Sequence, residues 1–364
     1  MKQTTARPAP WLAVIAIILA LVVLLFAWVG GFLSPARISG ARMTDAMQVA
    51  NGKIFPGYRR AHAKGACVTG HFTSNGAGAA LSRASLFAPG SVPVIGRFST
   101  GGGDPMAADG RVVFHALGLR FSLPGGEEWR MALDHTPIFI VSNPADFLAL
   151  MHASAPVAAT GKPDPATIGA FVGSHPETAA FLAYMKTAPL PSSFANGTYH
   201  SIDAFRFKDA NGRATAVRWQ FEPETPFAAL DKATIDKQPP DFLFDDLLAR
   251  AKQAPLKWHM VLVVANPGDR TDNATIEWTG PHRTIDAGEL VLDRATTEMQ
   301  GDCRDYNYDP TILPKGVAIS DDPLLATRSA VYSASFRRRG IEGPKPDALT
   351  LAQSGPAAPK GAAQ

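Results

Sequence analysis

The most apolar stretch of the chain lies near its N-terminus. Nineteen consecutive apolar residues run from Trp11 to Val29, and at about 1.5 Å per residue a helix of this length spans about 28 Å, close to the hydrocarbon thickness of a bilayer. Trp11 and Trp28 would lie near the two interfaces. A cleaved signal peptide has an apolar core of about 7–15 residues followed by small residues, and residues 30–36 match that pattern poorly. We therefore predict an uncleaved transmembrane anchor within residues 1–35, preceded by a short cytoplasmic tip.

Shorter runs of alternating or β-rich residues follow, and they predict strands. These runs are Ala66–Phe72, Val112–Phe121, Pro137–Val141, Ser201–Phe207, Ala214–Phe221, Trp258–Val264 and Glu289–Leu292. Helical spacing of apolar residues occurs at Ala145–His152, Glu177–Met185, Phe242–Ala251 and Pro323–Arg338. The segment Asp209–Gly212 has the residues of a hairpin turn between two of the strands.

The order of these elements predicts one α+β domain. Strands come first, helices are inserted between them, and a helix closes the chain, which indicates an antiparallel β-barrel with inserted and C-terminal helices, preceded by one transmembrane helix. No repeat and no Gly/Ser linker divides residues 40–340. Residues 341–364 are rich in Pro, Ala and Gly, so we predict a disordered tail there.

Composition narrows the classes of partner. A net charge of +3 over 364 residues is too small and too dispersed to indicate nucleic-acid binding. The nine histidines show no spacing typical of a structural zinc site, and Cys67 and Cys303 lie far apart in the sequence. In an oxidising compartment these two cysteines could form a disulfide, but a pair of buried free thiols is an equal alternative.

Candidate chemistry stands near the C-terminus. Asp321-Asp-Pro-Leu-Leu325 has the residues of a helix start, so Arg328 and Tyr332, four positions apart, would share one helical face. A cation one turn away favours the ionised phenolate of a tyrosine, and tyrosine is one of the few side chains that bind haem iron from the proximal side. The alternative is a tyrosine packed in the core beside a solvated arginine.

Four separate segments resemble the catalase superfamily, in the order in which that family carries them. They are Arg59-Arg-Ala-His62-Ala-Lys-Gly65, Arg97-Phe-Ser99-Thr100, Tyr306-Asn-Tyr-Asp-Pro-Thr-Ile-Leu-Pro-Lys-Gly316 and the helix that carries Arg328 and Tyr332. The resemblance covers roughly residues 50–340, and it implies a barrel that encloses haem b. Because the chain lacks the long extensions of full-length catalases, it looks most like the shorter catalase-related peroxidases.

The resemblance implies a distal side built on His62. A neutral imidazole can take a proton from one peroxide oxygen and return it to the other, and Ser99 would fix its tautomer through a hydrogen bond. Phe139 and Phe147 fall on the family's two aromatic positions beside the haem, although each could simply be a core residue.

The same resemblance implies that Tyr332 is the axial ligand and that Arg328 restrains the basicity of its phenolate. Arg59 and Arg97 would bind the haem propionates, which need paired cations when partly buried; the alternative is two surface arginines in ordinary ion pairs. Arg337, Arg338 and Arg339 suit the negative end of a helix dipole, and one of them would reach a propionate.

One position departs from the family. The distal asparagine of full catalases is replaced by Asp134, followed by His135. A carboxylate beside His62 would favour imidazolium, and we expect this coupled arrangement; the alternatives are a buried, protonated Asp134 that donates a hydrogen bond, or a side chain that points away. The replacement predicts weak or no catalase activity.

These features predict a haem-dependent peroxidase that reduces hydrogen peroxide or an organic hydroperoxide with an unidentified small-molecule reductant. The alternatives are an enzyme specific for lipid hydroperoxides and a non-catalytic haem-binding protein. Charges around the anchor are nearly balanced, with Lys2 and Arg7 before it and Arg37 and Arg42 after it. Resemblance to secreted peroxidases places the domain on the periplasmic side of the inner membrane, with a homodimer left open.

Overall fold

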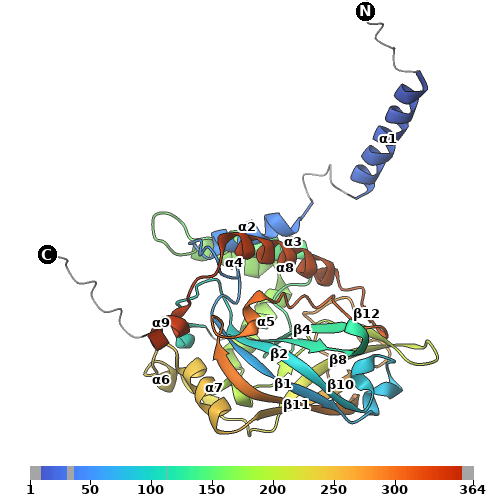
Figure 1. The fold of residues 1–364 in the computed structure, drawn as a ribbon. Coiled ribbons are helices and arrows are strands. Elements are labelled where there is room, and N and C mark those ends of the chain that lie inside the picture. The colour runs from blue at the N-terminus through green and yellow to red at the C-terminus, as the bar shows by residue number, and fades with distance from the viewer. Residues whose placement is uncertain (1–9, 31–36, 113, 355–364) are drawn as a thin grey trace, which may run out of the picture. The chain divides into compact units, whose positions relative to one another are not determined.

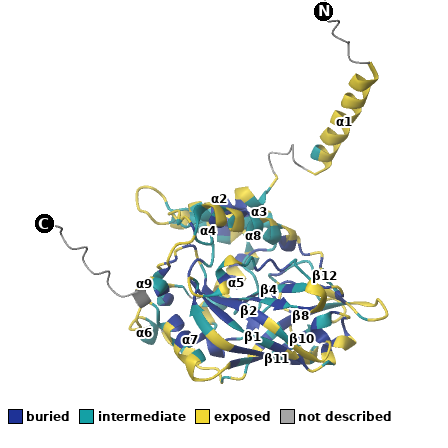
Figure 2. Ribbon diagram, in the orientation of Figure 1, coloured by how far each residue is buried: buried dark blue, intermediate teal, exposed yellow. Residues whose placement is uncertain are grey.

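The computed structural model describes residues 10–30, 37–112 and 114–354, and the chain divides into two units, Met1–Ser39 and Gly40–Gln364. The first unit contains helix α1 (Pro10–Val29), none of whose residues is buried (Figure 2). This helix is long and apolar enough to cross a membrane, a property that signal sequences near an N-terminus share. The predicted anchor therefore forms a helix, while residues 1–9 and 31–36 of that region lie outside the described residues.

The second unit is built on a closed antiparallel barrel of eight strands. Its order is β10-β11-β1-β2-β3-β4-β6-β8, and pairing of β8 with β10 closes it. The strands are β1 (Gly65–Ser74), β2 (Gly90–Thr100), β3 (His115–Ser122), β4 (Glu128–Asp134), β6 (Tyr199–His200), β8 (Ala214–Pro223), β10 (Leu256–Val264) and β11 (Arg283–Thr297). Strands β7 (Phe205–Lys208) and β12 (Val317–Ile319) continue the sheet beyond β8, and β5 (Leu190–Pro191) pairs with β9 (Ala229–Leu230).

Alternation along the strands fills the barrel. In β10, Leu256, Trp258, Met260 and Leu262 are buried while the residues between them are only partly so, which is the period-two pattern of a strand with one face in the core. Aromatic side chains such as Phe98 meet Trp258 there, with ring centroids 5.8 Å apart. The barrel interior is therefore a packed hydrophobic core, dark in Figure 2.

Helices cover the barrel from two sides. They are α2 (Gly40–Ala50), α3 (Pro144–Ala153), α4 (Pro165–Ser174), α5 (Pro176–Thr187), α6 (Lys232–Ile235), α7 (Phe242–Gln253), α8 (Pro323–Glu342) and α9 (Ala348–Ser354). Figure 1 shows α2, α3, α4 and α8 together on one side, with α6 and α7 on another. Short 3₁₀ turns occupy Ala77–Ala80, Ser85–Phe87, Asp109–Arg111, Pro124–Gly126, Phe194–Asn196 and η6 (Asp302–Asp305).

Local sequence sets the start of the two helices that matter for the site. Helix α8 begins where the Asp322 carboxylate accepts a hydrogen bond from Leu324 N at 2.9 Å, with Pro323 at the first helical position. Helix α3 begins where Asn143 accepts from Ala145 N and Asp146 N, both at 3.0 Å. Both caps satisfy backbone donors that the helix itself leaves free.

The α+β barrel is confirmed, but several predicted elements are wrong in detail. Residues 137–141 form no strand, because this segment leaves the barrel after β4 and bends towards α3. The runs at 112–121 and 201–207 become strands only from His115 and Phe205. Strands β2 and β4 and helices α2 and α4 were not predicted. The hairpin turn is confirmed, with Gly212 at φ 82° and its N–H donated to Asp209 O at 3.1 Å.

The prediction of a disordered tail from residue 341 is wrong as far as residue 354. Helix α8 runs to Glu342, which accepts Gly57 N at 2.6 Å and pairs with Arg60. The Tyr58 hydroxyl donates to Pro346 O at 2.6 Å, and Leu349 in α9 is buried. These contacts with residues 57–60 hold the segment on the domain, and composition alone gives no sign of them. Residues 355–364 lie outside the described residues.

Candidate active site

One cavity of about 390 Å³ lies between the barrel and the helical layer, and it collects the predicted site. Strands β2, β3 and β4 form one wall. Helices α2, α3, α5 and α8 and the loop residues 59–62, 139–140 and 307–308 form the rest. All nine residues singled out from the sequence line it: Arg59, His62, Arg97, Ser99, Asp134, Phe139, Phe147, Arg328 and Tyr332. The segments that resembled a family by order along the chain therefore also converge in space.

His62 sits just before β1 with a backbone φ of 55°, a left-handed conformation that is uncommon for a residue other than glycine. Its Nδ1 lies 3.3 Å from Ser99 Oγ, and the Phe114 ring lies 5.8 Å away, centroid to centroid. Although the cavity leaves part of the ring accessible, burial lowers the pKa of His62 to about 3, and the charges of Arg97, Arg59 and Arg328 lower it further in the same direction. The imidazole is therefore neutral at working pH.

Tyr332 and Arg328 stand one turn apart on one face of α8, and both line the cavity. Arg328 also pairs with the buried Asp203 and donates to Ala132 O at 3.4 Å. Burial alone would lower the pKa of Arg328, but Asp203, Tyr332 and Asp134 outweigh it and raise the pKa above its ordinary value. A permanent positive charge thus stands beside the phenol.

Arg97 and Glu298 form an ion pair with two hydrogen bonds at one end of the cavity. The Glu298 carboxylate accepts from Arg97 Nε at 2.7 Å and from a second guanidinium nitrogen at 2.9 Å. Arg59 Nε lies 3.9 Å from the same carboxylate. Burial would raise the pKa of Glu298, but Arg97, Arg59 and Arg339 hold it below its ordinary value, so the carboxylate is ionised.

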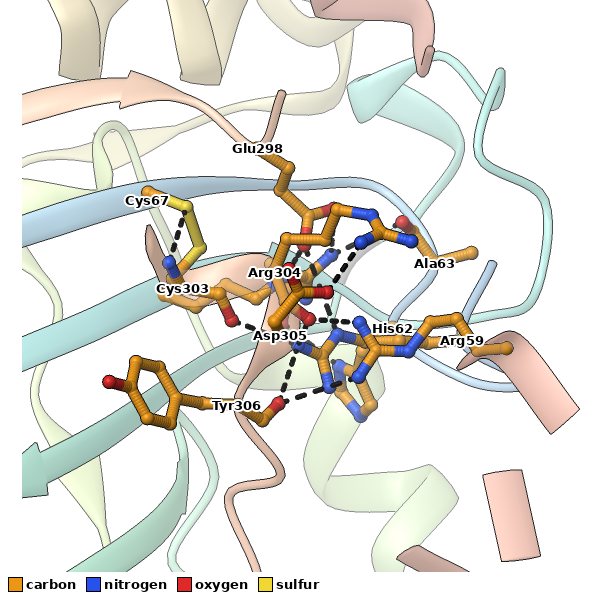
Figure 3. Close-up of polar contacts among 12 residues, drawn as sticks. Arg59, His62, Ala63, Cys67, Glu298, Cys303, Arg304, Asp305 and Tyr306 are labelled. Atoms are coloured by element: carbon orange, nitrogen blue, oxygen red, sulfur yellow. Dashed lines mark hydrogen bonds and ion pairs between the residues drawn. A yellow bond between two sulfur atoms is a disulfide. The ribbon is translucent and has the colours of Figure 1, made fainter. Parts of the chain in front are cut away.

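Arg59 and Arg339 converge on backbone carbonyls near this pair. Arg59 donates to the carbonyl oxygens of Cys303 and Arg304, both at 3.3 Å, and of Tyr306 at 3.1 Å (Figure 3). Arg339 donates to Arg304 O and Tyr306 O. Burial and the charge of Arg97 lower the pKa of Arg59 to about 10. Burial and the charges of Arg59 and Arg97 lower the pKa of Arg339 to about 9. Of the three arginines at 337–339, the structure therefore selects Arg339 as the cavity residue.

Asp134 ends β4 and is buried at the cavity wall. Burial raises its pKa to about 7, opposed by Arg328 and assisted by Asp203. The coupled arrangement expected from the sequence, an Asp134 carboxylate that keeps His62 as imidazolium, is wrong in direction because the pKa of His62 falls rather than rises. Burial and the arginines dominate instead, and the structure favours the alternative of a protonated Asp134 below neutral pH.

Phe139 and Phe147 form the apolar wall. Their ring centroids lie 5.8 Å apart, with 34° between the ring planes. Phe147 is held by α3, and Phe139 by a hydrogen bond from its N–H to Ala274 O at 2.9 Å.

Similarity to known proteins is strong over most of the chain. The family model described as catalase matches residues 34–355. The catalase-related peroxidase of Synechococcus elongatus is 37% identical, over 78% of this chain and 84% of its own length. The catalase-related peroxidase of Mycolicibacterium paratuberculosis is 30% identical, over 86% of this chain and 97% of its own length. The chain belongs to the catalase family.

Solved structures agree with this placement in the catalase family at the level of the fold. A fungal catalase matches with a TM-score of 0.70 at 17% identity, and a bacterial catalase with 0.69 at 22%. Each match covers 78% of this chain but only 59% and 58% of those chains, so the chain spans somewhat under two thirds of the length of the solved catalases.

Proteins of the catalase family bind haem, and the residues in this cavity fit that group. The Arg59 Nε atom and the Tyr308 hydroxyl are buried without a hydrogen-bond partner among the described residues. Three arginines and one carboxylate leave two net positive charges at one end of the cavity, enough to balance two propionates. The resemblance had supplied the arginines, whereas Glu298 and Asp203 were missed because no local pattern marks them. Tyr308 lies in the family-like segment 306–316 but was not singled out.

The structure also decides the state of the cysteines, which the sequence left open. Cys67 and Cys303 form a disulfide between β1 and η6, 236 positions apart in the chain. The bond is buried, and Cys303 N donates to Cys67 Sγ at 3.2 Å.

Proposed function

We propose that this protein is a haem peroxidase that reduces hydrogen peroxide or an organic hydroperoxide with electrons from a small organic donor, and that it has weak or no catalase activity. The observation that carries this proposal is the meeting of two pairs, His62 with Ser99 and Tyr332 with Arg328, in one cavity. The peroxidase activity named for the two catalase-related relatives supports it.

Haem b, the type we propose, would supply an iron centre that accepts the peroxide oxygen and stores two oxidising equivalents. Tyr332 would hold the iron through its phenolate oxygen, with Arg328 balancing the negative charge. Arg59, Arg97 and Arg339 would bind the propionates. Phe139 and Phe147 would pack on the ring and exclude water from one side.

His62 would move the proton. With the Nδ1 hydrogen donated to Ser99 Oγ, the lone pair of Nε2 is free to take a proton from one peroxide oxygen and return it to the other as the O–O bond breaks. The lowered pKa keeps this base available down to acidic pH. Asp134, protonated below about pH 7, would donate a hydrogen bond to the peroxide, as a neutral amide would.

Organic hydroperoxides are the second candidate substrate, because much of the cavity wall is apolar. Met43 and Met47 from α2 and Phe181 from α5 line it together with Phe139 and Phe147. Comparing turnover of hydrogen peroxide with that of a fatty-acid hydroperoxide separates the two.

The decisive experiment is peroxide-dependent oxidation of a dye by the purified, haem-loaded protein. Dye oxidation with little oxygen release supports the proposal. Haem uptake without dye oxidation would indicate a non-catalytic haem-binding protein, and rapid oxygen release without a donor would indicate a true catalase.

We also propose that α1 anchors the chain in the inner membrane with the domain on the periplasmic side. The Cys67–Cys303 disulfide supports this placement, since disulfides persist in oxidising compartments. Gel filtration in detergent tests the homodimer.

A further inference from the structure

Three cavity arginines depend on one short segment. Residues 298–306, which we name the bracing segment, follow β11 and include η6. Glu298 holds Arg97 through two hydrogen bonds. The carbonyls of Cys303, Arg304 and Tyr306 accept hydrogen bonds from Arg59 (Figure 3). Those of Arg304 and Tyr306 also accept from Arg339.

The Cys67–Cys303 disulfide fixes the bracing segment to the barrel. Cys67 lies in β1 directly opposite Arg97 in β2, so the covalent link stands at the level of the cavity arginines. Gly301 shows how closely the segment lies against it, because a Cβ added there would come within 2.5 Å of Cys67 Cβ and of Thr296 Oγ1. A shift of the bracing segment relative to β1 would disrupt this close packing.

Holding three cations together in a buried site is costly without such support. Arg59, Arg97 and Arg339 repel one another, and long side chains lose rotamer freedom when they are fixed. A ligand binds more tightly when the protein has already met this cost in its free state. The bracing segment supplies the fixed acceptors, and the disulfide keeps them in place.

We infer that the Cys67–Cys303 disulfide is a positioning element for the cofactor: through the bracing segment it keeps Arg59, Arg97 and Arg339 preorganised for the two haem carboxylates, so haem retention depends on the bond. The inference rests on the proposed function, which places haem in this cavity. Cys67 and Cys303 themselves touch neither substrate nor iron in this scheme.

Transfer of haem from the full-length protein in detergent to an excess of apomyoglobin measures retention without any activity assay. We expect Cys67→Ala/Cys303→Ala to release haem about tenfold faster than the parent, the scale on which loss of supporting contacts weakens cofactor sites. Gly301→Ala displaces the same segment with the disulfide intact, and it should also speed haem release. This variant provides the test if the double variant fails to fold.

A mutant cycle separates positioning from general stabilisation. In an Arg59→Ala background, removal of the disulfide should speed release by no more than about threefold, because one of the braced groups is already gone. In a Phe147→Ala background the full tenfold effect should remain, since Phe147 lies on α3 and packs against Phe139. Equal effects in both backgrounds would mean that the bond only stabilises the fold, and would overturn the inference.

Two further outcomes distinguish the inference from its premise. A parent protein that takes up no haem would overturn the proposed function, and this inference with it. A parent that binds haem but releases it at the same rate with and without the disulfide would overturn the inference alone.

Discussion

At the scale of single residues, burial and nearby charge set the proton chemistry of the cavity. The same environment lowers the pKa of His62 to about 3 and raises that of Asp134 to about 7, because burial favours the neutral form of each group. The two pKa values therefore stand in the reverse of their ordinary order. Below pH 7 the cavity holds a neutral imidazole and a neutral carboxyl group. This separation of the two pKa values is what the acid–base roles proposed for His62 and Asp134 require.

Tyr332→Phe removes the proposed axial ligand, and we expect loss of haem or a changed ligand-field spectrum in the ferric protein. Tyr308→Phe is the matched control, since it alters another phenol of the same cavity and should leave the tyrosinate spectrum in place. A ferric absorption spectrum of Tyr332→Phe identical to that of the parent would contradict the assignment.

His62→Ala should retain haem but slow the reaction with peroxide by about 10²-fold or more, because the proton acceptor is lost. Stopped-flow absorbance of the haem-loaded protein measures this step. Since the pKa of His62 lies near 3 and Asp134 is already protonated below its pKa of about 7, the parent rate should stay level from about pH 6 down to about pH 4.5. A parent-like rate in the variant would assign the proton transfer to another group.

Asp134→Asn tests the protonated carboxyl. With a pKa near 7, Asp134 is neutral below that pH and ionised above it, so the parent rate should fall as the pH rises through 7. The variant should lose this alkaline limb and release more oxygen, since an amide donates at every pH. Asp321→Asn, at an exposed position, is the control and should keep the parent profile. Coincident curves for parent and Asp134→Asn would show that the carboxyl takes no part.

At the scale of elements, β10 was predicted from its alternation and β2 was missed because of its special residues, whereas β4 was missed although it contains neither Pro nor Gly. Strand β10 alternates along its length, whereas β2 contains Pro93 and Gly96, which read as loop residues in a sequence. Position 96 favours glycine because an added Cβ would lie 2.9 Å from Leu119 Cδ2 inside the barrel. That requirement comes from a neighbouring strand, so local pattern could not reveal it.

The same distinction between local and distant requirements explains which site residues could be found from the sequence. His62 and Tyr332 stand in motifs that are contiguous in sequence, and the resemblance found them. Glu298 and Asp203 act through distant partners, 201 positions from Arg97 and 125 from Arg328. Their roles follow only from the barrel closure that brings these segments together.

Gly70→Ala tests the β1–β11 contact. The register shifts at this residue, and an added Cβ would lie 1.9 Å from Val291 O in β11. Backbone must move, so we expect a loss of about 2 kcal/mol in the free energy of unfolding, seen as a lower Tm. Gly169→Ala in α4, where an added Cβ meets nothing within 4 Å, is the control and should be neutral or slightly stabilising. Equal melting temperatures for Gly70→Ala and the parent would contradict the packing.

At the scale of the whole molecule, one bond ties the ends of the barrel domain together. The disulfide joins residues 236 positions apart, and a loop of that length corresponds to about 5 kcal/mol in the chain-entropy account. Stabilities of natural domains lie at about 5–15 kcal/mol, so this bond is a large share. A protein that relies on this bond would suit an oxidising compartment, which agrees with the proposal that the anchored domain lies outside the cytoplasm.

Helix α1 should hold the full-length chain in a membrane. Helix α1 is apolar on every side and has no buried residue, so in water it would expose its whole surface. We expect the full-length chain to stay in the membrane pellet after an alkaline carbonate wash, and its N-terminus to lie before residue 30. Leu19→Arg/Val22→Arg places two charges at the helix centre, each costing about 2.5–3.5 kcal/mol on insertion scales, and should move the protein to the soluble fraction. Release of the parent by high salt would show that the segment makes only a peripheral contact, because salt does not extract a helix that spans the bilayer. A mature N-terminus beyond residue 30 would show that the segment is a cleaved signal sequence.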